Sequence, residues 1–142
     1  MPFSDLNAPY AALRVCVNET GPGRVSGLVY SQRLTAPIAF SDLGTLLLRV
    51  DEVLDVQKFP QAFQKGRSFS ARESHVPAAH SPEGGLSAVE VDAQRGDIAT
   101  FAVQILSRRN SSWQGRVDWL DGETPQEFES ALELMRLIEE KV

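Results

Sequence analysis

The chain has 142 residues, of which 42% are hydrophobic and 23% are charged, and it carries a formal net charge of −5 at pH 7. This length suits one domain, and the composition excludes a disordered or fibrous protein. The acidic balance argues against a protein whose main task is to neutralise a phosphate backbone. Cys16 is the single cysteine, which excludes an internal disulfide. With no secretion signal and no apolar run long enough to cross a bilayer, we expect a soluble cytoplasmic protein.

The first half of the chain predicts three strands followed by a helix. Residues 13–17 and 25–31 alternate in polarity and are separated by the turn-forming stretch NETGPG, which is typical of two neighbouring strands. A short third strand is expected to end at Phe40, and Ser41 or Asp42 is placed to cap the helix that follows. The apolar positions of this helix recur every three or four residues and are Leu43, Leu46, Leu47, Val50 and Leu54.

Residues 57–97 have a different composition, rich in Gly, Pro, Ser and Ala. We expect this linker to contain an exposed loop in its middle, at 70–85. Three phenylalanines, Phe59, Phe63 and Phe69, are unusual in such a segment. They are expected to pin the linker to the body of the protein, or else to contribute to a partner site.

The second half repeats the order of the first. Residues 101–105 and 113–119 predict two strands, and an Asp-Gly turn leads to a short third strand that ends at Phe128. Ser130 and Glu133 have the spacing of a capping box at the start of a helix. The apolar stripe of this helix consists of Ala131, Leu134, Met135, Ile138 and Val142.

The two halves align without a gap at an offset of 88 residues, which places Gly27 on Gly115 and Phe40 on Phe128. This similarity predicts an internal duplication. We therefore expect one α+β domain over residues 1–142, built as a tandem β-β-β-α repeat. It would have about six antiparallel strands, two helices on one face of the sheet and a pseudo-twofold axis. The units are 11–56 and 98–142, with 57–97 as the linker.

Strand parity separates an inner from an outer face in each half. In the second half, Trp113, Gly115, Val117 and Trp119 share the face expected to point to the core, and the opposite side chains are polar. Trp119 lies at the end of the strand, where we expect partial burial.

In the first half the outer face is also apolar, because Leu28 and Tyr30 lie on it. Such a patch must be covered by the linker phenylalanines or by another chain. The candidate interaction surface therefore consists of Leu28, Tyr30, Phe59, Phe63 and Phe69. It supports our first hypothesis, a small non-catalytic module that binds another protein or a second copy of itself.

A second hypothesis is nucleic-acid binding through the hairpin of the second half. Arg108, Arg109 and Arg116 surround Trp113, and a sheet that carries aromatic and arginine side chains can stack bases and hold phosphates. The acidic net charge and the lack of a known RNA-binding motif argue against it.

Catalytic, metal and cofactor signatures are missing from the sequence, so we expect no enzyme and no cofactor. Cys16 has no evident histidine partner, and His75 and His80 lie in the linker without the further ligands that zinc needs. A small-ligand pocket or an undetected active site is the third hypothesis, which a deep cleft with converging polar groups would support.

The second half also resembles a pattern found in small uncharacterised bacterial proteins, W-x-G-x-V-x-W/H, then F-x-S, then E-L-x-x-L/I. Its residues here are Trp113, Gly115, Val117, Trp119, Phe128, Ser130, Glu133, Leu134 and Ile138. The first half shares only Gly27, Val29, Phe40 and the helix pattern with it. The resemblance implies the fold and a bacterial cytoplasmic setting, and it supplies no function because the group has no established activity.

Overall fold

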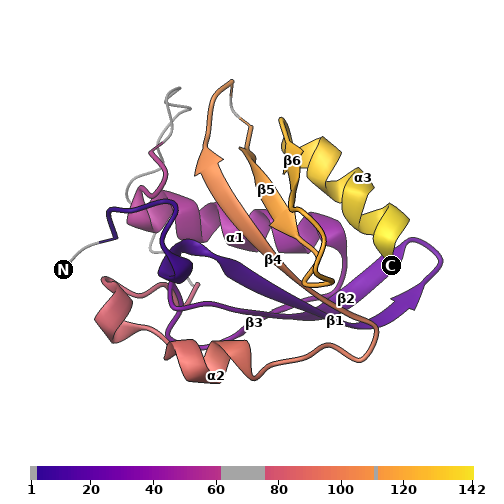
Figure 1. Cartoon of the computed structure of the whole chain (residues 1–142), viewed down its shortest axis with the longest axis horizontal. Helices are drawn as coiled ribbons and strands as arrows, with labels where there is room; N and C mark the ends of the chain where they lie inside the picture. The colour runs from indigo at the N-terminus through magenta and orange to yellow at the C-terminus, as the bar shows by residue number, and fades with distance from the viewer. Residues whose placement is uncertain (1–2, 62–75, 111) are drawn as a thin grey trace.

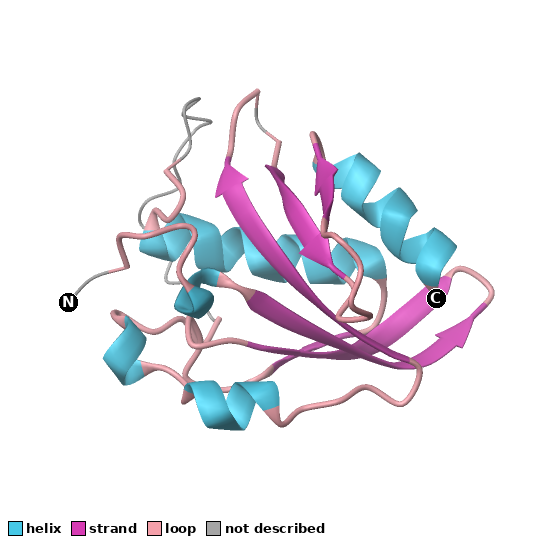
Figure 2. Ribbon diagram, viewed as in Figure 1, coloured by secondary structure: helices cyan, strands magenta, loops and turns pink. Residues whose placement is uncertain are grey.

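The computed structural model describes residues 3–61, 76–110 and 112–142. Within these residues, six strands form one antiparallel sheet in the order β3-β2-β1-β4-β5-β6 (Figure 1). The strands are β1 (Leu13–Gly21), β2 (Arg24–Tyr30), β3 (Ile38–Phe40), β4 (Ala99–Ser107), β5 (Gln114–Asp118) and β6 (Gln126–Phe128). The helices include α1 (Leu43–Gln57), α2 (Ala88–Asp92) and α3 (Ala131–Lys141), and short 3-10 turns occur at Pro9–Ala11 and Pro82–Gly84 (Figure 2). The predicted α+β class and tandem β-β-β-α order are confirmed.

The two halves meet edge to edge, through antiparallel pairing of β1 with β4. Leu13 pairs with Val103 and Val15 pairs with Phe101, so exchanging the two halves converts one pair into the other. Arg14 opposite Ala102 is the centre of this exchange. The register thus follows the pseudo-twofold relation that the offset of 88 residues predicts.

Both hairpins of the sheet also have the same irregularity. The β1–β2 pairing shifts between Val17 and Glu19, and the β4–β5 pairing shifts between Ile105 and Ser107. These are corresponding positions at the offset of 88 residues. A β-bulge twists and re-aims the end of a hairpin, so both hairpin tips leave the sheet in the same way.

Helices α1 and α3 cover one face of the sheet, and the main hydrophobic core lies between them and the strands (Figure 1). As parity predicts, Trp113 is 5% exposed and Val117 is fully buried. Trp119 is 9% exposed, so it is more deeply buried than its place at the strand end led us to expect. Its indole packs against the ring of Phe101, with 5.1 Å between the ring centroids.

The opposite face is partly covered by chain outside the two repeats. The Arg14 side chain points to this face, and its Nε donates a hydrogen bond of 2.8 Å to the carbonyl oxygen of Gln94 in the linker. Gln104, on the same face of β4, donates to the carbonyl oxygens of Leu6 and Ala8 at 3.4 Å. The linker and the N-terminal segment therefore each cover part of the outer face.

The linker contains more regular structure than its composition predicts. Helix α2 begins after Ser87, whose hydroxyl accepts a hydrogen bond from the Glu90 amide, and it buries Val91. An isolated bridge joins Ala78 to Leu34. A helix of five residues is too short to produce a recognisable apolar period, which is why the composition of 57–97 indicated only a linker with a loop at 70–85, just before this helix. Among the described residues, no helix is long and apolar enough to cross a membrane.

Both long helices begin at a side-chain cap, at corresponding positions. Asp42 Oδ1 accepts from the Thr45 amide at 2.7 Å, and Ser130 Oγ accepts from the Glu133 amide at 3.0 Å. The Glu133 carboxylate bonds to the amide of Glu129, one residue before the partner that a strict capping box would use.

We expect Ser130→Ala to reduce the free energy of unfolding by about 1 kcal/mol, because the first turn of α3 loses the acceptor for one free amide. Urea denaturation followed by circular dichroism measures the change. Ser130→Asp keeps an acceptor at this position and should remain close to the wild type. Equal losses in the two variants would contradict a capping role.

Candidate functional site

The candidate interaction surface does not form one continuous patch in the described residues. Leu28 and Tyr30 are half-buried on the outer face of β2. Phe59 is 6% exposed, packs against the rings of Phe3 and Tyr10, and lies with its ring centroid 4.9 Å from the Arg33 guanidinium carbon. Phe63 and Phe69 lie outside the described residues.

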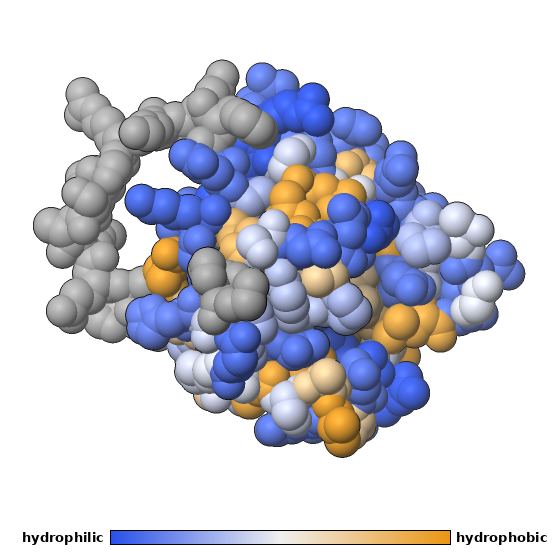
Figure 3. All heavy atoms as spheres, turned by 60° about the vertical axis from the view of Figure 1, so that its left-hand side comes forward, coloured by the Kyte–Doolittle hydropathy of each residue, from blue (hydrophilic) through white to orange (hydrophobic). Residues whose placement is uncertain are grey.

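Other apolar side chains at the surface are scattered. Val89 in α2 is 82% exposed, Leu48 in α1 is 68% exposed and Leu132 in α3 is 64% exposed. On the side that Figure 3 turns forward, hydrophobic residues form several separate areas among hydrophilic ones. Single exposed apolar residues are normal for soluble proteins, so they do not define a site.

The four residues of the nucleic-acid hypothesis divide into two groups. Arg108 is 6% exposed and Trp113 is 5% exposed. Arg109 is exposed, and half-buried Arg116 donates to Gln104 at 2.9 Å and to Asn7 at 3.3 Å. Stacking of bases needs an accessible aromatic face, which Trp113 does not offer.

Arg108 instead reaches from the β4–β5 hairpin to the C-terminal turn of α1. Its guanidinium donates to Asp55 Oδ1 at 2.6 Å, to the Pro60 carbonyl oxygen at 2.8 Å and to the Leu54 carbonyl oxygen at 3.3 Å. Trp113 lies on the same side and donates its indole N–H to Asp51 Oδ1 at 3.1 Å. Arg108 and Trp113 together close the space between this hairpin and α1, and we call them the hairpin plug.

Burial of the Asp51 carboxyl raises its pKa, and the hydrogen bond from Trp113 opposes this rise. Asp51 also lies 3.8 Å from the Arg108 guanidinium. Two carboxylates of α1 thus hold the plug: Asp51 accepts the indole N–H of Trp113, and Asp55, one turn later, accepts from the guanidinium of Arg108.

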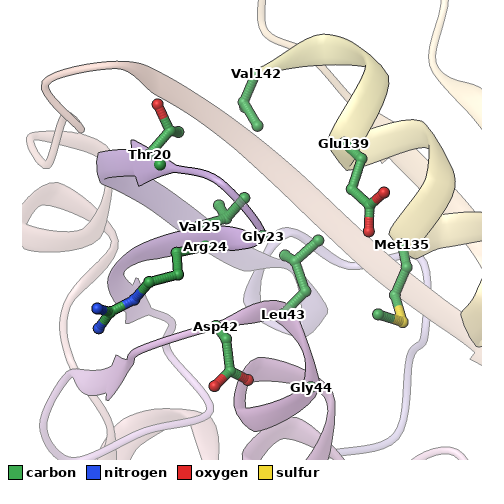
Figure 4. A pocket seen from close by; sticks show the side chains of 11 residues that line it. Thr20, Gly23, Arg24, Val25, Asp42, Leu43, Gly44, Met135, Glu139 and Val142 are labelled. Atoms are coloured by element: carbon green, nitrogen blue, oxygen red, sulfur yellow. The ribbon is translucent and has the colours of Figure 1, made fainter.

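A groove of about 530 Å³ lies at the other end of the molecule, between the β1–β2 hairpin, the start of α1 and the end of α3 (Figure 4). Figure 1 shows the end of α3 beside the tip of this hairpin. The residues that line the groove are Thr20, Gly21, Gly23, Arg24, Val25, Asp42, Leu43, Gly44, Met135, Glu139 and Val142. This size is within the range of sites that hold small molecules or a few side chains.

The groove combines apolar and charged side chains. In Figure 4, Leu43, Met135 and Val142 point into the space between the elements, and Glu139 extends from α3 into the same space. The Arg24 guanidinium points away from α3. The hydrogen bond from the Thr45 amide lowers the pKa of Asp42, and Arg24 adds a weaker effect in the same direction.

The groove and the hairpin plug occupy corresponding places in the two halves. At the offset of 88 residues, Thr20 corresponds to Arg108 and Val25 corresponds to Trp113. Two long side chains fill the space in the second half, and two short ones line it in the first half. The two corresponding positions of the tandem units are therefore filled in one half and lined by short side chains in the other.

Within residues 3–61, 76–110 and 112–142, the remaining cysteine and histidine side chains do not form a second site. Cys16 is buried, and this burial raises the pKa of its thiol. His80 is exposed, and His75 lies outside the described residues. In the part of the chain that the structure describes, no group of three His, Cys, Asp or Glu residues could hold a metal ion.

Arg33 is a further buried cation that sequence reasoning did not single out. Its side chain is fully buried, bonds to Gln57 Oε1 at 2.8 Å and also donates to the Phe59 carbonyl oxygen. Burial, with a smaller effect from Arg108, lowers the pKa of Arg33 to about 9. These contacts fasten the loop after β2 to the end of α1, which is a structural role.

Comparisons with family models, curated proteins and solved structures give no match to this chain. The groove residues also carry no sequence signature, because glycine, valine and threonine in a hairpin are common. The one available signal in the sequence is that, when the two halves are aligned, Thr20 and Val25 stand where the second half has Arg108 and Trp113.

Proposed function

We propose that the protein is a non-catalytic protein-recognition module that binds a segment of another protein in the groove between the β1–β2 hairpin, α1 and α3. The observation that carries this proposal is the groove itself, which is open in one half and filled by Arg108 and Trp113 in the other. A position that the protein closes with its own side chains in one copy is suited to accept foreign side chains in the other.

The lining favours a peptide segment over a small substrate. The groove is bounded by a hairpin turn and by the ends of two helices, and Thr20, Arg24 and Glu139 on its rim are exposed. A small-molecule site usually encloses its ligand with a few converging polar groups. An apolar floor with a charged rim is instead the usual composition of a protein interface.

The charges favour protein over nucleic acid as the partner. Asp42 and Glu139 place two carboxylates on the groove, against one guanidinium from Arg24. Phosphate binding requires an excess of positive charge. The chain as a whole is also acidic, with a formal net charge of −5.

Selection from a random peptide library tests the proposal. The wild-type protein is immobilised, and enriched peptides are then measured by titration calorimetry against wild type and Val25→Trp. Val25→Trp places an indole at the position that corresponds to Trp113, so we expect it to close the groove and to abolish binding. Circular dichroism confirms that the variant is folded.

A second pair of variants distinguishes loss of the groove from loss of folding. Glu139→Lys reverses a charge on the groove, and Glu140→Lys makes the same change at an exposed neighbour outside it. Enriched peptides should lose affinity for the first variant and keep it for the second. A wild-type protein that enriches no peptide, or peptides that ignore both Val25→Trp and Glu139→Lys, would contradict the proposal.

A further inference from the structure

Resting on the proposed function, the structure also indicates what the groove binds. We propose that it accepts an arginine and a tryptophan side chain from one segment of a partner protein, in the arrangement that Arg108 and Trp113 have in the hairpin plug. The inference uses the second half of the molecule as an internal template for the first.

The backbones around the two positions correspond closely enough for this comparison. Both hairpins have their bulge at corresponding residues, and both helices begin after a capping residue at corresponding positions. Ser112 Oγ accepts from the Ala131 amide at the start of α3, and Arg24 and Leu43, the residues that correspond to this pair, both line the groove. The groove therefore shares its hairpin bulge and its helix start with the plugged position, while Asp55 and Pro60, which also hold Arg108, have no counterpart among the groove residues.

The size of the open space follows from the side chains that differ. Thr20 replaces the guanidinium-bearing Arg108, and Val25 replaces the indole-bearing Trp113. Two large side chains are thus replaced by short ones where a groove of about 530 Å³ lies. An arginine and a tryptophan from outside would restore the packing that the second half has.

The helix side of the groove supplies the matching polar partner. Asp51 accepts the indole N–H of Trp113 and lies 3.8 Å from the Arg108 guanidinium. Its counterpart at the offset of 88 residues is Glu139, which extends into the groove (Figure 4). A carboxylate is thus present at both positions, but Thr20 and Val25, the counterparts of Arg108 and Trp113, offer it neither a guanidinium nor an indole.

The contacts of Arg108 with α1 are also reproduced in part. The Leu54 carbonyl accepts from Arg108, and Val142, the counterpart of Leu54, lines the groove. Arg24 is the one cation on the rim, and its guanidinium points away from α3 (Figure 4). An incoming arginine would therefore meet Glu139 without facing Arg24 directly.

The Arg108 and Trp113 of this chain cannot serve as the ligand, since both are buried in their own half. The occupant is therefore a segment of a different protein that carries the same pair. A peptide with the sequence RRNSSW, which is that of residues 108–113, is the natural probe.

The test is titration of the isotopically labelled full chain with the capped peptide RRNSSW, followed by amide chemical shifts. We expect shifts at Gly21, Gly23 and Gly44, whose amides report on the groove directly. The peptides RRNSSA and QQNSSW should each bind at least about tenfold more weakly, because one loses the buried indole and the other loses the cations.

Two variants then locate the binding. Glu139→Lys should weaken RRNSSW about fivefold, and Glu140→Lys should leave it unchanged. Equal affinity of all three peptides, or shifts confined to other parts of the chain, would overturn the inference. If the library selection yields peptides that depend on the groove but lack the arginine–tryptophan pair, the proposed function stands and this inference is wrong.

Discussion

Gly115→Ala is expected to lower the free energy of unfolding by about 3 kcal/mol, because the added methyl group has no room beside the neighbouring strand. A Cβ atom at Gly115 would lie 2.0 Å from the carbonyl oxygen of Gln104 and 3.0 Å from its carbonyl carbon. These are backbone atoms of β4, so the contact is relieved only by moving the strand. Urea denaturation at low temperature, followed by circular dichroism, measures the loss.

Gly27→Ala should have a similar effect, because its Cβ atom would lie 1.9 Å from the Cys16 carbonyl oxygen of β1. Gly21→Ala is the matched control, since no atom lies within 4 Å of its added Cβ. We expect the control to change stability by less than about 0.5 kcal/mol. Similar stabilities for Gly115→Ala and Gly21→Ala would show that the close approach of the strands is not required.

The same two glycines explain why much of the fold could be predicted from the sequence. They stand at the same place in both halves, within strands whose polarity alternates with the period of the sheet. Alternation, helical spacing and turn residues are local properties, and each half repeats them. The strands, the long helices and the buried face of Trp113 and Val117 followed from these signals.

The parts that could not be predicted depend on contacts between distant residues. The joining of β1 to β4 is a choice of sheet edge, and nothing local distinguishes it from stacking of two sheets. Arg33 and Arg108 are buried although arginine is usually exposed, because each finds carbonyl and side-chain partners near the end of α1. These partners are distant in the sequence, so local sequence patterns do not predict them.

The candidate site escaped prediction for a related reason. Sequence reasoning looks for reactive or bulky residues, so the nucleic-acid hypothesis took Arg108 and Trp113 as surface groups, although strand parity placed Trp113 toward the core. Their size is what buries them, since both reach across to α1. In the alignment of the two halves, only the short residues Thr20 and Val25 mark the groove. They line a groove only because of the elements that surround them, which the sequence does not show.

The two hairpins differ in a way that gives one repeat a stabilising role and leaves the other free for recognition. In the second half, Arg108 and Trp113 join the hairpin to α1 and add to the core. In the first half, the shorter Thr20 and Val25 line a groove beside α3, although Val25 itself is buried in the core. One repeat thus carries contacts that hold the molecule together, which permits the other to expose a binding position.

This division predicts that Arg108→Ala destabilises the protein by about 3 kcal/mol. The variant removes three hydrogen bonds at and just after the end of α1: the Pro60 carbonyl oxygen loses the guanidinium donor, and the Leu54 carbonyl oxygen keeps only the amides of Lys58 and Phe59. It also leaves Asp55 without the ion pair at 2.6 Å. Urea denaturation followed by tryptophan fluorescence measures the change, because Trp113 lies beside the replaced side chain.

Arg109→Ala is the matched control, because Arg109 is the exposed neighbour in the same turn. We expect it to alter stability by less than about 0.5 kcal/mol. Arg108→Lys keeps the charge but has no planar fork to reach both carbonyl oxygens and Asp55, so it should recover only part of the loss. If Arg108→Ala is as stable as Arg109→Ala, the buried guanidinium does not hold the hairpin to α1, and the hairpin plug loses its value as a template for the groove.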